Sequence, residues 1–235
     1  LAAETSRFNR AAARVAREAR DVAGRDALVA GSIGPLGAPT RDLLRFDEAR
    51  IREAYREQID GLLEGGVDLL MLETFVDLRH LLIAADEARR ATADLPIVAQ
   101  LTFGEELELA DGSSPVAAAA VLEEAPVDVV GVNCGAGPHA CLEAIEALDA
   151  PSGGRPARSI LPNAGLPQRI EGQFVYAAGP DYFGAMVPRM LEMPGSLTTG
   201  LNLGAEVKLL GAAERLNEPP CTTKPGMLRW KVLFE

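Results

Sequence analysis

The stretch Val127-Asp-Val-Val-Gly-Val-Asn-Cys-Gly-Ala-Gly-Pro138 contains the pattern that decides the fold. Its first six residues are mostly apolar and β-branched, which is typical of a buried parallel strand. Asn133 and Cys134 follow directly, and the glycines after them indicate a turn. A helical pattern then runs from His139 to Leu148. The stretch therefore predicts a strand, a polar strand end and a helix, which together form one βα unit.

The same unit recurs along the chain. Further helical patterns cover Phe8 to Ala23, Asp47 to Glu64, Leu78 to Ala93 and Ser114 to Glu124. Further short apolar runs, expected to be strands, cover Ala27 to Ala30, Val67 to Leu72, Pro96 to Leu101 and Ser159 to Leu161. Strands that alternate with helices predict a parallel sheet with right-handed crossovers.

Two architectures fit this alternation, a doubly wound sheet and a (β/α)8 TIM-type barrel. Polar residues stand at the carboxyl ends of four successive strands, namely Glu73, Thr102, Asn133 with Cys134, and Asn163. In a barrel all strand ends converge on one site, whereas in an open sheet only the strands beside the switch point share a crevice. The pattern favours an α/β barrel of which about five βα units are present.

Composition excludes several classes of protein. The 235 residues carry a formal net charge of −11 and are 48% hydrophobic, which is ordinary for a globular chain and unfavourable for binding nucleic acid. No apolar run is long enough to span a membrane. Three cysteines are too few for a disulfide framework, and no signal peptide opens the sequence at Leu1. We therefore expect a cytoplasmic protein.

The polar strand ends supply the candidate site residues. Cys134 could be a nucleophile or a metal ligand, or simply a small buried hydrophobic residue. Glu73 could act as a base, bind a substrate ammonium group, or cap the next helix. Asn163 lies in a tight turn, where Asn is common for backbone reasons. His80 and His139 stand near helix starts and are expected on the surface.

Four segments resemble the homocysteine S-methyltransferase family when they are taken together and in order. They are Gly31-Ser-Ile-Gly-Pro-Leu-Gly37, Gly66-Val-Asp-Leu-Leu-Met-Leu-Glu-Thr-Phe75, Gly131-Val-Asn-Cys-Gly-Ala-Gly-Pro138 and Pro162-Asn-Ala-Gly-Leu-Pro167. The residues from Pro162 to Phe183 look closest to bifunctional members, which carry a methylenetetrahydrofolate reductase domain after the methyltransferase.

The resemblance implies a barrel that transfers a methyl group to the thiol of homocysteine, giving methionine, with one Zn²⁺ at the strand ends. Cys134 matches the family's first zinc ligand. Glu73 matches the residue that holds the substrate ammonium group, and Asn163 matches an amide near the metal. With Thr102 and Asn133, these two residues form the predicted substrate-binding set. The expected partners are homocysteine and a methyl donor.

The sequence also departs from the family pattern. The motifs of the first two strands are absent, and Leu201-Asn-Leu-Gly204 stands where the family has a Cys pair. Cys221 only faintly echoes a later family motif and is a weak candidate ligand. We therefore expect a partial homocysteine-binding barrel over residues 1–192 and a divergent tail of unknown role over 193–235. The alternatives to a zinc enzyme are an inactive fragment or non-catalytic relative, or a metal-free barrel enzyme using Glu73 and Asn163.

Overall fold

The computed structural model describes residues 4–24, 27–37, 47–149, 157–166, 168–176, 178–192 and 196–199. The helices are α1 (Thr5–Ala23), α2 (Glu48–Gly65), α3 (Leu78–Ala91), α4 (Pro115–Leu122), α5 (Pro138–Asp149) and α6 (Pro180–Glu192). The strands are β1 (Ala30–Ile33), β2 (Leu69–Phe75), β3 (Ile97–Leu101), β4 (Val129–Cys134), β5 (Ala157–Pro162), β6 (Gln168–Ile170), β7 (Gln173–Val175) and β8 (Ser196–Thr199).

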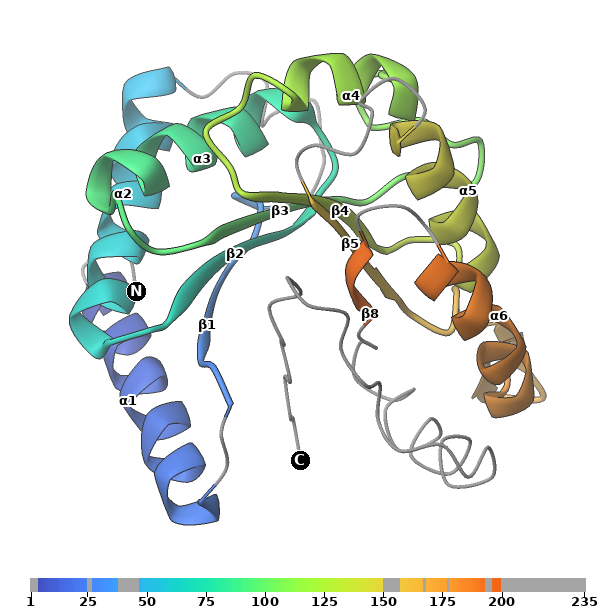
Figure 1. The fold of residues 1–235 in the computed structure, drawn as a ribbon, viewed down its shortest axis with the longest axis horizontal. Helices are drawn as coiled ribbons and strands as arrows, with labels where there is room; N and C mark the ends of the chain where they lie inside the picture. Colours follow the sequence, from blue (N-terminus) through green and yellow to red (C-terminus); the bar gives the residue numbers. More distant parts are fainter. Residues whose placement is uncertain are drawn as a thin grey trace.

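Six strands form one sheet in the order β1-β2-β3-β4-β5-β8, and every neighbouring pair is parallel. The sheet curves, and the helices lie along its convex side (Figure 1). Because consecutive strands are neighbours and a helix separates most of them, their carboxyl ends all lie at one rim. The predicted α/β fold of the TIM-barrel type, present in part, is confirmed.

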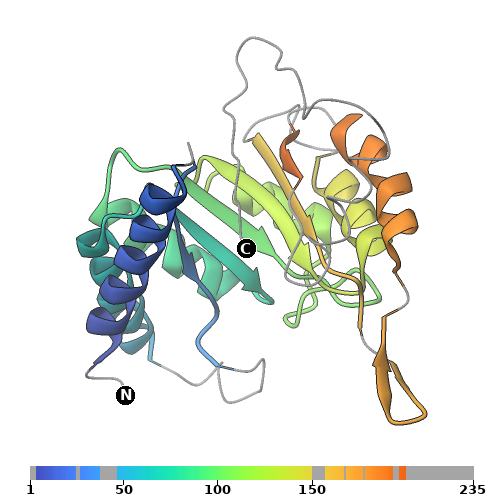
Figure 2. The same cartoon turned by 90° about the horizontal axis from the view of Figure 1, so that it is seen from below.

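The structure differs from the predicted elements in four places, one of which is helix α6, where no helix was predicted. The first strand is Ala30–Ile33, whereas the sequence predicted a strand over Ala27 to Ala30. A sixth parallel strand, β8, pairs with β5 in a region where no strand was expected. Strands β6 and β7 form an unpredicted antiparallel hairpin, which projects away from the sheet (Figure 2).

Helix ends follow the expected local chemistry. The side chains of Asp47, Asp77 and Ser114 accept hydrogen bonds from backbone N–H groups in the first turns of α2, α3 and α4. Gly66 ends α2 in the left-handed conformation, with φ +85°. Within the described part of the chain, no helix has the length and apolarity needed to cross a membrane.

Helix α3 is buried over most of its surface, and this overturns one prediction. His80 was expected on the surface but is 1% exposed, with Nδ1 3.4 Å from Asp77 Oδ2. Glu87, two turns further along the same face, is 2% exposed and pairs with Arg52 of α2. Because α3 packs against both the sheet and α2, polar residues on its α2 side are enclosed. His139, by contrast, is exposed as predicted.

The two faces of the sheet have different compositions. The convex face, together with the helices, forms the main apolar core. The concave face carries a smaller apolar cluster centred on Leu69, Val98 and Val129. Because side chains alternate along a strand, the next residues on this concave face are Gln100 and Ser159. Polar side chains therefore begin on the concave face before the strands reach the rim.

Candidate functional site

Glu73 lies near the end of β2, half-buried, and accepts a hydrogen bond from the hydroxyl of Ser32 on β1. Ser32 is two residues after Ala30 and so lies on the same face of β1. Ala30 packs on the concave apolar cluster, so Ser32 and Glu73 face the concave side. The alternative role for Glu73, capping the next helix, belongs to Asp77 instead. The Glu73 carboxylate is therefore held at the inner rim by a neighbouring strand.

Asn133 connects three strand ends. Its side chain is 1% exposed, and Oδ1 accepts a 2.9 Å hydrogen bond from the backbone N–H of Thr74 at the end of β2. Nδ2 donates to the hydroxyl of Thr74, also at 2.9 Å. The hydroxyl of Thr102, just past β3, donates to the backbone oxygen of Asn133 at 2.9 Å. Asn133 thus links the ends of β2, β3 and β4, although Thr74 is 59 residues away in sequence.

Cys134 is the last residue of β4 and is half-buried. Its Sγ atom lies 3.4 Å from Asn133 Nδ2 and 3.8 Å from Thr74 Oγ1. Its backbone has φ +56°, a left-handed conformation that is uncommon for a residue other than glycine. The predicted residues Thr102, Asn133 and Cys134 therefore form one cluster, and Thr74 completes it.

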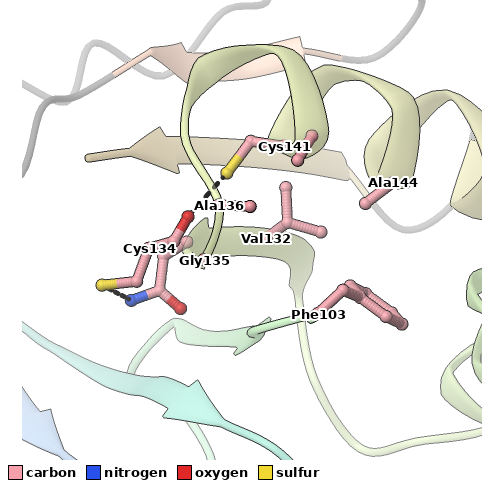
Figure 3. A pocket seen from close by; sticks show the side chains of 9 residues that line it. Phe103, Val132, Cys134, Gly135, Ala136, Cys141 and Ala144 are labelled. Atoms are coloured by element: carbon pink, nitrogen blue, oxygen red, sulfur yellow. Dashed lines mark hydrogen bonds between the residues drawn. The ribbon is translucent and has the colours of Figure 1, made fainter. Parts of the chain in front are cut away.

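Cys141, on α5, lies behind this cluster. Its thiol donates a 2.9 Å hydrogen bond to the backbone oxygen of Cys134. Burial, and secondarily the nearby charge of Cys134, raises the pKa of the Cys141 thiol to about 12. Figure 3 shows the Cys141 sulfur approaching that oxygen of Cys134 from the helix. Cys141 therefore supports the backbone of the cluster and is not available as a thiolate.

A small pocket separates the end of β4 from α5 (Figure 3). Its lining is mostly apolar and consists of Phe103, Val132, Asn133, Cys134, Gly135, Ala136, Ala140, Cys141 and Ala144. Apart from Asn133 and the two cysteines, the lining side chains carry no polar group. The pocket therefore adds space behind Cys134 without adding a further functional side chain.

Asn163 lies just beyond β5, in the turn that its sequence indicated. Its Oδ1 accepts a hydrogen bond of 3.1 Å from the backbone N–H of Gly165. This turn packs against the loop after β4, because a Cβ atom on Gly137 would lie 3.3 Å from the Cα of Gly165. The ends of β4 and β5 are therefore in direct contact, which puts Asn163 at the same rim as Cys134.

This arrangement can be compared with known proteins. A family model described as homocysteine S-methyltransferase matches residues 1–211. The chain belongs to the homocysteine S-methyltransferase family. The resemblance found in the sequence is thereby confirmed, and the match continues through β8.

Several relatives of known name share this family region. Methionine synthase of Mycobacterium tuberculosis is 36% identical over 163 residues, which cover 65% of this chain and 13% of that protein. S-methylmethionine–homocysteine S-methyltransferase BHMT2 of Pongo abelii is 33% identical over 133 residues, covering 55% of this chain and 34% of that protein. This chain thus spans at most about a third of either relative.

A solved structure shares the fold. The homocysteine methyltransferase MmuM of Escherichia coli, in its metallated form, superposes with a TM-score of 0.71 at 20% identity. The match covers 91% of this chain and 72% of that one. At this identity the comparison supports the barrel-type fold assigned above.

The donor atoms present can be tested against the zinc centre that the family implies. Among the described residues, no three Cys, His, Asp or Glu side chains lie together as a metal site requires. Cys134 stands at the expected strand end, but Cys141 is protonated and turned to a backbone oxygen. Cys221 and the segment Leu201–Gly204 lie outside the described residues. The described donors therefore do not fit a complete zinc centre, which usually has three protein ligands.

Sequence reasoning missed two residues of this site, Ser32 and Thr74. Ser32 lies beyond the predicted strand Ala27 to Ala30, so its position opposite Glu73 was hidden. Thr74 adopts φ +64°, which no sequence pattern of a β-branched residue indicates. Its place directly after Glu73 at a strand end was the signal that could have drawn attention to it.

Proposed function

We propose that this chain binds homocysteine at the carboxyl ends of β1 to β5, for transfer of a methyl group to the homocysteine thiol. The observation that carries the proposal is the cluster in which Asn133 joins Thr74, Thr102 and Cys134 at one rim. A homocysteine S-methyltransferase needs its amino-acid and sulfur-binding groups at such a rim. Residues 1–192 contain all these side chains and are proposed as the homocysteine-binding barrel domain.

Glu73 is proposed to bind the ammonium group of homocysteine. Its carboxylate faces the concave side, and Ser32 provides the one hydrogen bond described for it. A carboxylate has about four acceptor positions, so acceptor capacity remains for an ammonium group. Ser32 would keep the carboxylate oriented while the substrate binds. Asn163 and Thr102 would contribute polar groups at the same rim.

We further propose that methyl transfer by this chain depends on zinc. Bound Zn²⁺ would lower the pKa of the homocysteine thiol and so make it a better nucleophile. In this chain Cys134 would be one ligand, and Cys221 is the remaining cysteine that could supply a second thiolate. The measurement is zinc content per purified chain, beside the variants Cys134→Ser and Cys221→Ser. About one zinc per chain, lost in both variants, would support the zinc enzyme.

A second candidate is a non-catalytic relative that binds homocysteine without methylating it. The incomplete donor set in the described part of the chain and the sequestered Cys141 favour it. Homocysteine binding with no zinc, and no methionine formed from S-methylmethionine, betaine or a methylated folate, would select this candidate. Methionine formation that survives chelation of metal would instead support a metal-free enzyme.

The cellular setting is proposed to be the cytoplasm. The Cys141 thiol donates a hydrogen bond to a backbone oxygen and is in no disulfide, which a reducing compartment preserves. Homocysteine and a methyl donor are the proposed partners.

A further inference from the structure

We propose that Thr74 is a positioning residue whose hydroxyl fixes the orientation of the Cys134 sulfur. The inference rests on the proposed function, because it concerns a residue of the same rim. Thr74 and Cys134 both have positive φ angles, +64° and +56°, and their side chains contact each other. Such conformations are unfavourable for residues other than glycine and persist where surrounding contacts impose them.

The contact that holds Thr74 comes from Asn133. The backbone N–H of Thr74 can only donate, so the Asn133 atom 2.9 Å from it must be the amide oxygen. This fixes the orientation of the amide, and Nδ2 must then face the Thr74 hydroxyl at 2.9 Å. The pairing of β2 and β3 is irregular between Leu72 and Phe75, which gives Thr74 the room to turn toward β4.

Asn133 and Thr74 both make polar contacts with the Cys134 sulfur. An amide nitrogen carries two hydrogens, and one of those on Asn133 is used by the Thr74 hydroxyl. The second points to the Cys134 sulfur, 3.4 Å away. The Thr74 hydroxyl also lies 3.8 Å from the Cys134 sulfur, and either atom of this pair can be the donor. Polar contacts from β2 and β4 therefore converge on one sulfur atom.

The convergence has a specific consequence for the site. The contacts from Asn133 and Thr74 favour one rotamer of Cys134. The Asn133 amide is locked by three further hydrogen bonds, so it cannot follow if the sulfur moves. Replacing the Thr74 side chain keeps the backbone N–H bond to Asn133 Oδ1, so one hydrogen bond still links β2 and β4.

The test measures the Cys134 side-chain rotamer by NMR couplings in protein labelled at cysteine, without metal or substrate. Thr74→Val removes the hydroxyl and keeps the shape, Thr74→Ser keeps the hydroxyl, and Thr74→Gly removes the hydroxyl while accommodating the positive φ. Cys134→Ser identifies the signal. Thr92→Val serves as the control, because Thr92 lies at the end of α3 and has no described contact with Asn133 or Cys134.

We expect one dominant Cys134 rotamer in the parent, Thr74→Ser and Thr92→Val proteins. In Thr74→Val and Thr74→Gly the rotamer ratio should change about fivefold, the equivalent of one hydrogen bond. If Thr74→Val does not fold, Thr74→Gly gives the result. An unchanged rotamer ratio in the folded variants would overturn the assignment. Homocysteine titration of the same proteins separates this outcome from failure of the proposed function, which would appear as absent binding in the parent protein.

Discussion

Gln100 donates a hydrogen bond of 2.8 Å to Ser159 across a strand that lies between them. In the sheet register, Gln100 of β3 is opposite Gly131 of β4, and Gly131 is opposite Ser159 of β5. The amide can cross β4 because Gly131 has no side chain. Both polar residues are buried, so this bond ties three strands together beneath the rim.

Replacing Gly131 with alanine should disrupt the sheet. The added Cβ would overlap the backbone oxygen of Ser159, which cannot move without separating β4 from β5. We expect Gly131→Ala to lower the free energy of unfolding by more than about 3 kcal/mol. The matched control is Gly179→Ala, where a Cβ would meet no atom within 4 Å. Equal stability of the two variants in urea titrations would refute this role for Gly131.

Acid stability should depend on Glu87. Burial alone would raise its pKa, but hydrogen bonds from Arg52 and Arg56 outweigh burial and hold the pKa below its ordinary value. Because the folded-state pKa is lower, the carboxylate stabilises the fold at neutral pH, and this contribution is lost as pH falls through that pKa. Glu87→Gln should cost about 3 kcal/mol at pH 7.

The stability difference between Glu87→Gln and the parent should shrink as the pH falls below about 4. Thermal unfolding monitored by circular dichroism over a pH series measures it. Glu143→Gln, which alters an exposed pair with His139, should follow the parent at every pH. A difference between Glu87→Gln and the parent that is constant with pH would contradict the ionised network.

The two described thiols should differ in reactivity. With the Cys141 pKa raised to about 12, only about one part in ten thousand is thiolate at pH 8. Iodoacetamide should therefore modify the half-buried Cys134 in native protein and spare Cys141 until the protein is denatured. Peptide mass spectrometry distinguishes the two cysteines. Rapid labelling of Cys141 in the native protein would show that its thiol is accessible, contrary to this prediction.

The order of elements could be predicted because it depends on local patterns. Apolar runs such as Val129 to Val132 and caps such as Ser114 are readable within a few residues. The hairpin β6–β7 was missed because its residues are exposed and carry no alternation of apolar and polar side chains. Helix α6 was obscured by Pro188 inside it.

The residues of the site could be predicted from the sequence, but most of the contacts between them could not. Polar strand ends indicated Glu73, Thr102, Asn133, Cys134 and Asn163, since parallel strands bring their ends together. The links between these residues depend on sheet register and on two positive φ angles, neither of which a single sequence specifies. The burial of His80 was missed because it depends on how α3 packs against α2.

The central claim, homocysteine binding at this rim through Glu73, is tested most directly by calorimetric titration of homocysteine into the purified chain. We predict binding by the parent protein and by Glu124→Gln, which changes an exposed carboxylate elsewhere. Glu73→Gln should weaken binding at least about tenfold, the loss expected for a hydrogen bond between charged groups. Equal homocysteine affinity of Glu73→Gln and the parent would contradict the account.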